Sequence, residues 1–479
     1  MKKTKGIITA VLVASCLAGC GNTTNYDENY GVYDGSEVNI KFYHTMGNTL
    51  KPVFDLYLEK FNELYPNIKV EAKSIGNYDD VRDQIKTEIS ATEGPNIAYC
   101  YPDHIALYNK ANRIVVLDNY IDSKEQQQTY ATDPLVDNFT EVLGLTEAQK
   151  ADFVEGYYNE GKAFGDDKMY SLPLSKSTEI LYYDLTFFQK HNLTVPTNWE
   201  EMEDVCRQIK AIDPAAIPLG YDSSSNWFIT MCEQYGSDYT SATGDHFLFN
   251  NAQNKAFVKE FAEWYKDGLV TIKELYGSYT SGLFTNQTAN DQGKTVRSYM
   301  CIGSSAGATY QLPTQVNGKY PFEVGVAPIP QVSEATASVI SQGPSLCLFK
   351  SSNVQEVNAS WLLMKYLTTN VNFQAQFSMV SGYVPVIKSV FDHPVYVEEF
   401  LNKGDTGAGI AAASVKVCVE QADNYFYSPA FVGSSEARDQ VGAIMSAAMS
   451  QATKTGGLTD AQLDQIFQDA IDECEYIAG

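Results

Sequence analysis

Basic side chains are scarce in this 479-residue chain: 34 Lys and Arg stand against 59 Asp and Glu, which gives a formal net charge of −25. A surface with so much negative charge repels nucleic acid and anionic lipid headgroups. The charge balance therefore argues against nucleic-acid binding. It also predicts no general attraction for anionic ligands.

Residues that typically hold metals or cofactors are also sparse. The five histidines are scattered without metal-type spacing, and neither a P-loop nor a Gly-x-Gly-x-x-Gly motif occurs. The nine cysteines lie far apart and form no Cys-x-x-Cys pair, so we expect buried thiols rather than a disulfide framework. No cofactor and no metal site are predicted.

Long apolar runs are lacking, and the one short run lies near the N-terminus. A lysine-rich start precedes Gly6 to Leu17, and the run ends in Leu17-Ala18-Gly19-Cys20. Because this run is shorter than the ~20 residues that span a bilayer, it favours a lipoprotein signal peptide. We predict a signal peptide over residues 1–19, lipidation of Cys20, and a flexible tether over residues 20–36. The alternative is an ordinary signal peptide, cut near Ala18.

The remaining body, about 440 residues, is too long for one hydrophobic core, so two lobes are expected. Its first part alternates strand and helix signals. Residues 38–43 show period-two hydrophobicity, and an apolar helical stripe from Val53 to Leu64 follows, with Pro52 near its first turn. A second strand, a second helix and a third strand (residues 96–101) come next. This alternation predicts a parallel sheet with crossover helices.

Aromatic residues are plentiful, at 32 Tyr, 23 Phe and 4 Trp. Tyrosine and tryptophan combine a flat apolar face with a polar group, which suits sugars because their C–H faces stack on rings while their hydroxyls need partners. Most such rings fill cores in any protein. The signal is stronger where tyrosines stand in loops beside Gly, Ser and Asp, as in Gly76-Asn77-Tyr78-Asp79.

One motif favours an enzyme instead. Gly303-Ser304-Ser305-Ala306-Gly307 follows a predicted strand and matches the Gly-x-Ser-x-Gly nucleophile elbow, with His393 downstream as the general base. A secreted esterase is therefore one alternative, and a glycosidase using paired carboxylates is another. Small residues in a tight turn explain the same motif without catalysis. We predict a protein that is not an enzyme, with no catalytic residues.

Two further segments carry a family resemblance. They are Ser175-Lys176-Ser177-Thr178-Glu179-Ile180-Leu181-Tyr182-Tyr183-Asp184 and Ser381-Gly382-Tyr383-Val384-Pro385-Val386. In their order and spacing the chain resembles the extracellular solute-binding proteins (family 1, sugar-binding class) of ABC importers, and within them the glycerol-3-phosphate-binding branch most.

The resemblance implies an α/β, two-lobed, periplasmic-binding-protein-like fold (type II) with a ligand cleft between the lobes. It implies an N-terminal lobe of residues 37–174 plus 303–368 and a C-terminal lobe of residues 175–302 plus 369–479. The lobes would hinge near residues 173–178, 302–305 and 366–371. It also implies two permease subunits and an ATPase as partners, and a monomeric protein anchored on the extracytoplasmic face of the membrane.

Carried over position by position, the resemblance gives a set of ligand-binding candidates. They are His44, Tyr78, Asp103, Ser177, Trp227, Ser304, Ser305, Gly343 and Tyr383.

Two departures from the glycerol-3-phosphate branch bear on the ligand. Asp103 stands where that branch has a glutamate, and Arg438 falls out of register with its late arginine, which leaves Lys176 as a candidate cation. Because arginine is suited to grip phosphate, we predict a neutral sugar or short oligosaccharide as the ligand. Glycerol-3-phosphate or a glycerophosphodiester is the alternative.

Overall fold

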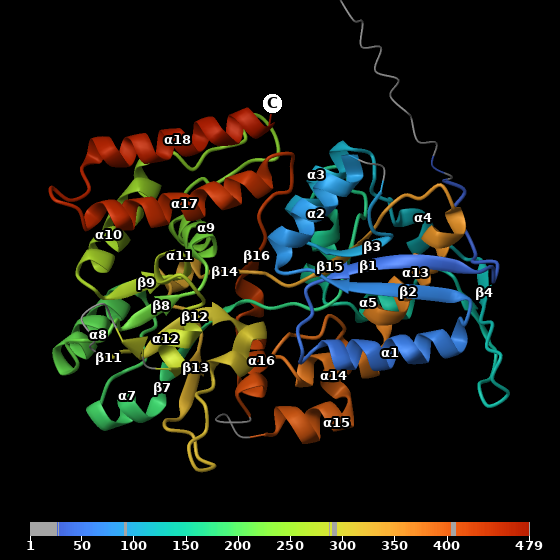
Figure 1. Ribbon diagram of the computed structural model, residues 1–479, viewed down its shortest axis with the longest axis horizontal. Coiled ribbons are helices and arrows are strands. Elements are labelled where there is room, and N and C mark those ends of the chain that lie inside the picture. The colour runs from blue at the N-terminus through green and yellow to red at the C-terminus, as the bar shows by residue number, and fades with distance from the viewer. Residues whose placement is uncertain are drawn as a thin grey trace, which may run out of the picture.

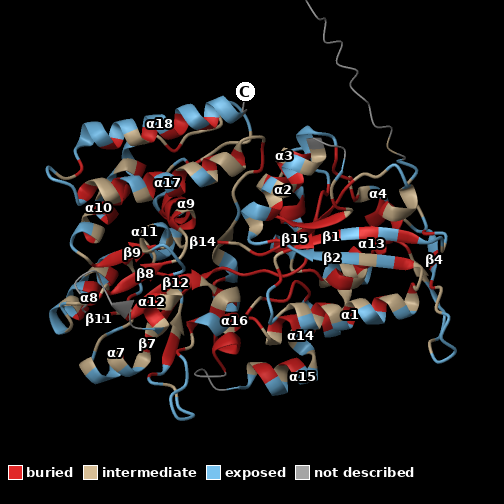
Figure 2. Cartoon of the chain, in the orientation of Figure 1, coloured by how far each residue is buried: buried red, intermediate tan, exposed pale blue. Residues whose placement is uncertain are grey.

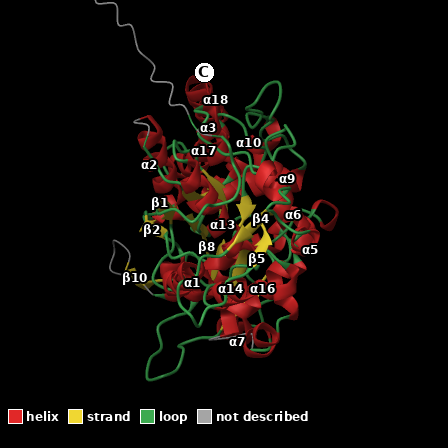
Figure 3. Ribbon diagram, turned by 90° about the vertical axis from the view of Figure 1, so that its right-hand side faces the viewer, coloured by secondary structure: helices red, strands yellow, loops and turns green. Residues whose placement is uncertain are grey.

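The computed structural model describes residues 26, 28–90, 93–286, 288–289, 295–403 and 409–478. Two lobes lie side by side, each around a five-stranded sheet (Figure 1). Turned by 90°, the molecule shows its strands enclosed between helices (Figure 3). The predicted two-lobed α/β fold is thus confirmed. The predicted signal peptide and Cys20 lie outside the described residues.

The first lobe has the strand order β2-β1-β3-β15-β6. Its strands are β1 (Val38–His44), β2 (Ile68–Ser74), β3 (Ile97–Cys100), β6 (Leu172–Pro173) and β15 (Ser345–Leu348). β1 pairs in parallel with β2 and β3, as the strand–helix alternation predicts, whereas β15 runs antiparallel to β3 and β6. The antiparallel strand arises because β15 returns from the other lobe.

Both faces of this sheet are covered. Its helices include α1 (Lys51–Leu64), α2 (Tyr78–Ser90), α3 (Pro102–Lys110), α13 (Val354–Thr369) and α14 (Val371–Met379). Because strand side chains alternate, Phe42 packs with Phe54 of α1 on one face, while Tyr43 packs with Val81 of α2 on the other. The stripe predicted for α1 is confirmed where Phe54, Tyr57 and Phe61 are buried.

The second lobe has the strand order β13-β7-β12-β8-β9. Its strands are β7 (Glu179–Asp184), β8 (Leu219–Tyr221), β9 (Val270–Ile272), β12 (Met300–Ser304) and β13 (Val324–Ala327). Its larger helices are α7 (Leu185–His191), α8 (Trp199–Ile212), α9 (Ser224–Tyr235), α10 (Ala252–Lys266), α17 (Ser434–Ala452) and α18 (Asp460–Ala478). α18 lies on the outside and exposes its outer side (Figure 2).

The second sheet also packs on both sides. Leu181 joins the core under α8, α9, α10 and α17, whereas its neighbours Ile180 and Tyr182 join the core of the first lobe together with α16 (Ile410–Glu420). α16 therefore bridges the lobes. Shorter elements complete the chain: α4 (Asp118–Ile121), β4 (Gln126–Gln128), β5 (Thr140–Val142), α5 (Glu147–Asp152), α6 (Glu155–Asn159), α11 (Lys273–Tyr276), α12 (Ser281–Thr285), η2 (Ser305–Gln311), β14 (Val339–Ile340), α15 (Pro394–Tyr396) and β16 (Tyr425–Phe426).

The predicted lobe boundaries need two corrections. β13 lies within predicted residues 303–368 but pairs with β7 in the second sheet. α14 lies within predicted residues 369–479 but packs on α1, with Phe373 and Tyr57 ring centroids 5.4 Å apart. The chain passes between the two large sheets at residues 174–178 and again before β15, near residues 341–344, and residues 427–433 join β16 to α17 of the second lobe. Only the first of these segments coincides with a predicted hinge.

The predicted flexible tether is wrong for residues 28–36, which pack on the first lobe, and Tyr33 is buried at 1% exposure. The Tyr33 backbone N–H donates to Gln127 Oε1 at 2.8 Å, and Gly31 N donates to Asn358 Oδ1 at 3.2 Å. The aromatic ring adds to the apolar core, so this part of the segment packs on the first lobe.

The cysteine prediction is confirmed for the described part of the chain, where Cys100, Cys206, Cys232, Cys301, Cys347, Cys418 and Cys474 are buried free thiols. Among these described residues, no helix has the length and apolar character needed to cross a bilayer. The same residues contain no cluster of three or more His, Cys, Asp or Glu side chains arranged to hold a metal ion.

Candidate ligand-binding site

A cavity of about 950 Å³ lies between the two lobes. Loops after β1, β2 and β3 line it from the first lobe, and the start of α9, the α11–α12 region, η2 and α17 line it from the second. Five polar residues of its lining are at 3% exposure or less: Ser177, Glu179, Ser224, Asn226 and Gln311. Tyr279 and Tyr310 stand at its rim, 55% and 65% exposed.

The first-lobe wall is aromatic. Asn77 Oδ1 accepts hydrogen bonds from the N–H groups of Asp79 and Asp80, which starts α2 and sets Tyr78 in its first turn. The Tyr78 ring stacks on Tyr101 at 4.6 Å, and its hydroxyl lies 3.3 Å from the Tyr383 hydroxyl. Burial raises the pKa of Tyr78 and Tyr383, so both phenols stay neutral and can donate or accept hydrogen bonds.

The second-lobe wall is polar and hydrogen-bonded. Ser223 caps α9 by accepting from Asn226 N, which turns the first turn of that helix toward the cavity. Glu179 accepts from Tyr221 Oη at 2.5 Å and from Asn226 Nδ2 at 3.1 Å. Asn226 Oδ1 in turn accepts from Arg438 Nη2. These contacts place a carboxylate and a guanidinium on opposite ends of one side-chain amide.

Two carboxyls of this wall are held in low-dielectric surroundings. Burial raises the pKa of Glu179 to about 7, although its two donors favour the ionised form. Burial also raises the pKa of Asp222, whose Oδ1 accepts from Thr280 N at 2.6 Å and Thr280 Oγ1 at 2.7 Å. Both groups can accept ligand hydroxyls, because carboxylates are strong hydrogen-bond acceptors.

One contact joins the walls at the edge of the cavity. Arg82 of α2 reaches α17, where its Nη1 lies 3.1 Å from Asp439 Oδ2 and 2.7 Å from Ser435 Oγ. Arg82 also lies 2.9 Å from Asp83 of its own helix. Burial raises the pKa of Asp439 to about 6, against the opposing effect of Arg82. The contact spans the two lobes in the described arrangement.

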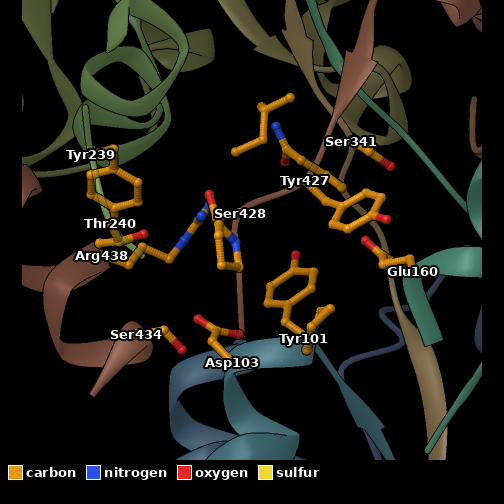
Figure 4. A pocket seen from close by; sticks show the side chains of 14 residues that line it. Tyr101, Asp103, Glu160, Tyr239, Thr240, Ser341, Tyr427, Ser428, Ser434 and Arg438 are labelled. Carbon is orange, nitrogen blue, oxygen red and sulfur yellow. The ribbon is translucent and has the colours of Figure 1, made fainter. Parts of the chain in front are cut away.

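A smaller pocket of about 50 Å³ adjoins the main cavity, and Tyr101, Gln342 and Arg438 line both. Figure 4 shows it with Asp103 and Tyr101 from the first lobe facing Arg438 across the space. Asp103 Oδ1 accepts from His104 N at 3.0 Å.

The family of bacterial extracellular solute-binding proteins matches residues 57–402, which is more than half of the chain. The chain belongs to this family. The resemblance read from the sequence is thereby confirmed, and the molecule is an extracytoplasmic solute-binding protein.

Relatives of this solute-binding protein bind different molecules. The sn-glycerol-3-phosphate-binding periplasmic proteins UgpB of Shigella flexneri and Escherichia coli K12 are each 22% identical over 371 residues, covering 74% of this chain and 75% of theirs. Among solved structures, the GacH receptor of Streptomyces glaucescens, determined unliganded and with acarbose, has TM-score 0.67 and 14% identity, covering 91% of this chain and 98% of its own. UgpB of Mycobacterium tuberculosis with glycerophosphocholine has TM-score 0.68 and 16% identity, covering 92% and 98%. The structures establish the shared fold.

Five predicted site residues of the solute-binding protein line the main cavity: Tyr78, Ser177, Ser304, Gly343 and Tyr383. Asp103 lines the adjoining small pocket instead. His44, Trp227 and Ser305 line neither of these two pockets.

The placement of Trp227 is a correction. It is fully buried and stacks on Tyr221 at 4.7 Å and Trp199 at 5.8 Å. The position follows from α9: its first residues face the cavity, but Trp227 follows them on the side of the helix that packs into the second-lobe core. Its ring therefore has no face open to a ligand.

His44 and Ser305 are also corrected. His44 is fully buried, its Nδ1 accepts from Met46 N at 3.1 Å, and burial lowers its pKa to about 4. Ser305 is fully buried, and its Oγ accepts from Thr178 N at 3.3 Å. A nucleophile elbow needs an exposed serine, so the geometry at Ser305 gives the esterase alternative no support.

The two cations exchange roles relative to the prediction. Lys176 is fully buried and forms an ion pair with Glu160, so it does not face the cavity. Arg438, predicted to fall out of register, lines both the main cavity and the small pocket. Its place on the first turns of α17, rather than in the preceding loop, brings it there.

Sequence reasoning missed Glu179, Asn226, Tyr279, Tyr310 and Lys273 as cavity-lining residues. Glu179 lies within Ser175 to Asp184, one of the two segments that carry the family resemblance. An acidic side chain beside the apolar residues of a strand could therefore have indicated a binding role. Tyr279 stands in a Gly-Ser-Tyr-Thr-Ser loop of the kind that flags Tyr78. Asn226 and Lys273 carry no local signal.

Proposed function

We propose that this solute-binding protein captures a neutral carbohydrate, a sugar or short oligosaccharide, and delivers it to an ABC importer. The observation that carries the proposal is the cavity between the lobes, where tyrosine rings on one wall face hydroxyls and carboxylates on the other. Its volume, about 950 Å³, lies near the top of the ~300–1,000 Å³ range of small-molecule sites. A carbohydrate of more than one ring has a size that suits a cavity of this volume.

The charges of the lining support a neutral ligand. Carboxylates of Asp79, Glu179, Asp222, Glu274 and Asp439 outnumber the cations Lys273 and Arg438. Arg438 already contacts Asn226, and Lys273 Nζ lies 4.4 Å from the ring centroid of Tyr279. Sugar hydroxyls can donate to the carboxylates, whereas a phosphate would be repelled by them.

Isothermal titration calorimetry of the purified chain against mono-, di- and trisaccharides tests this function. We expect saturable binding of at least one carbohydrate and weaker or no binding of glycerol-3-phosphate. Tyr78→Ala should weaken that binding, and Tyr476→Ala, at a tyrosine that is 83% exposed outside both pockets, should not. Failure of every carbohydrate to bind would overturn the proposal.

A second candidate is a glycerol phosphate or glycerophosphodiester. Arg438 in the cavity favours it, since a guanidinium can bind phosphate through two N–H groups. In the same titrations, tight binding of glycerol-3-phosphate that is lost in Arg438→Gln would establish this candidate. Binding of a carbohydrate that tolerates Arg438→Gln would exclude it.

The remaining assignments are proposals about the cellular context. Two permease subunits and an ATPase would receive the ligand from a monomeric binding protein, and Cys20 would carry the lipid anchor. Cys20→Ala should release the protein from the membrane into the medium, and retention would contradict the anchor.

We further expect no catalytic turnover, in keeping with the buried Ser305. Hydrolysis of generic ester or glycoside substrates that disappears in Ser305→Ala would show an enzyme.

A further inference from the structure

The small pocket adjoins the main cavity, and most of the residues that line it carry polar groups. Tyr101 and Asp103 line it from the first lobe, Tyr239, Thr240 and Arg438 from the second, and Ser428 from the connection between them. In Figure 4 the side chains of Asp103, Tyr101, Ser428 and Arg438 surround one common space. Its volume of about 50 Å³ holds roughly three or four water-sized groups, since one such group needs ~10–15 Å³.

Three polar atoms in this lining are buried and have no hydrogen-bond partner within the described chain. They are Thr240 Oγ1, Gln342 Nε2 and Ser428 Oγ. Buried polar groups in folded proteins are nearly always paired, because an unpaired one loses its hydration without compensation. Three such atoms around one pocket indicate that a hydrogen-bonding group completes it.

The charges around the pocket define the chemistry of that group. Asp103 offers an acceptor and Arg438 offers donors, while the charge of Glu160 is balanced by its ion pair with Lys176. Gln342 Nε2 can only donate, so its partner must accept. An anion would accept from Gln342 but would lie beside Asp103, and a cation would lie beside Arg438. A neutral hydroxyl both donates and accepts, and it fits all of these groups.

The connection to the main cavity identifies the molecule that supplies this hydroxyl. Gln342, Tyr101 and Arg438 line both spaces, so a group projecting from a ligand in the main cavity can enter the small pocket. We propose that the pocket is a subsite for the exocyclic hydroxymethyl group of a hexose unit. Its hydroxyl donates to Asp103 and accepts from Gln342 Nε2, and its methylene lies against the tyrosine rings. This inference rests on the proposed carbohydrate function and names hexoses, rather than pentoses, as the substrate class.

Matched sugars that differ only in the hydroxymethyl group test the subsite. Such pairs are D-glucose and D-xylose, D-galactose and L-arabinose, D-mannose and D-lyxose, and cellobiose and xylobiose. Titration calorimetry with the full chain should show at least one pair in which the hexose member binds tenfold or more tightly than its partner. Equal affinities within every pair that binds would overturn the subsite but leave the carbohydrate function standing. Binding of no sugar at all would overturn both.

Two variants locate the effect in the pocket. Ser428→Leu fills the space, and it should reduce the affinity for the hexose member to that of the pentose member while leaving the pentose affinity unchanged. Ser333→Leu, on an exposed serine of the second lobe, is the matched control and should leave both affinities unchanged. Weakening of both members by the same factor in Ser428→Leu would contradict the assignment.

Thr240→Ala keeps the inference testable if Ser428→Leu does not fold, which thermal denaturation would reveal. Removing this hydroxyl should weaken hexose binding threefold to tenfold and leave pentose binding unchanged. An unchanged ratio between the two members of the pair in Thr240→Ala would overturn the subsite.

Discussion

The two walls of the cavity present opposite chemistry from structurally similar lobes. The first-lobe wall presents the stacked rings of Tyr78 and Tyr101, whereas the second presents the network of Glu179, Asn226 and Arg438. Both lobes place these groups in loops or at the first residues of helices, except Glu179, which is the first residue of β7. The difference teaches that the fold supplies the position of a binding wall, while the residues at the ends of its strands and helices supply its character. Stacking on the tyrosine rings favours the ring faces of a ligand, and hydrogen bonds with the polar wall fix the positions of its hydroxyls.

The largest expected effect is on stability, at Lys176 in the crossover between the two lobes. Lys176 pairs with Val384 next to Tyr383, and its Nζ forms the buried ion pair with Glu160. Lys176→Met would leave Glu160 buried without its partner, which we expect to cost about 3–5 kcal/mol of unfolding free energy. Urea denaturation measures the loss.

Lys259→Met is the matched control, because Lys259 pairs with Asp460 at 2.5 Å on the surface, where solvent screens the pair, and its loss should change the unfolding free energy far less. Equal losses in the two variants would show that the crossover pair does not hold the walls together.

The polar wall should be sensitive to pH. The pKa of Glu179 is raised from about 4.5 when unfolded to about 7 when folded, so the folded state binds the proton more tightly. Stability should therefore fall as pH rises from about 4.5 to 7 and then level off, by up to about 3 kcal/mol. Glu179→Gln should remove this slope and be the more stable protein at pH 8. Denaturation at pH 5, 6, 7 and 8 measures it.

Glu59→Gln, on an exposed residue of α1, serves as the control and should retain the slope. A slope of the same size in Glu179→Gln would assign the pH dependence to other groups.

The aromatic wall should respond to loss of the ring more than to loss of the hydroxyl. Tyr78→Ala removes the stacking face and should weaken carbohydrate binding about tenfold to a hundredfold, or ~1.4–2.8 kcal/mol. Tyr78→Phe keeps the ring, loses only the contact with Tyr383, and should weaken binding less than about fivefold. Calorimetry compares the two. A larger loss in Tyr78→Phe would mean that the first wall acts through hydrogen bonding, as the second does.

The smallest effect is expected where the walls meet at the cavity edge. Arg82 is 13% exposed and joins Asp439 across the lobes, so Arg82→Ala should weaken binding about threefold to tenfold, mainly through faster ligand release. Stopped-flow dissociation measures this, and a double-mutant cycle with Asp439→Asn isolates the pair. Independent effects of the two substitutions would show that this contact does not hold the lobes closed.

Local sequence patterns were sufficient for the architecture. Alternating hydrophobicity over residues 38–43 and the stripe of α1 predicted the parallel β1-β2-β3 unit, because these signals depend on periodicity within one element. The length of the body also predicted two lobes, because the relation of surface to volume limits the size of a single hydrophobic core. The family resemblance then predicted Tyr78, Ser177, Gly343 and Tyr383 as ligand-binding residues, and all of these line the cavity.

Only the tertiary structure decided which rings and charges reach the ligand. Trp227 and Tyr279 are both aromatic residues near polar loops, yet one is fully buried and the other is 55% exposed. Arg438 enters the cavity because α17, distant in sequence, packs on α9. Lys176 does not face the cavity because its side chain forms a buried ion pair with Glu160. Exposure and pairing depend on which distant segments pack together, and no local pattern of residues contains that information.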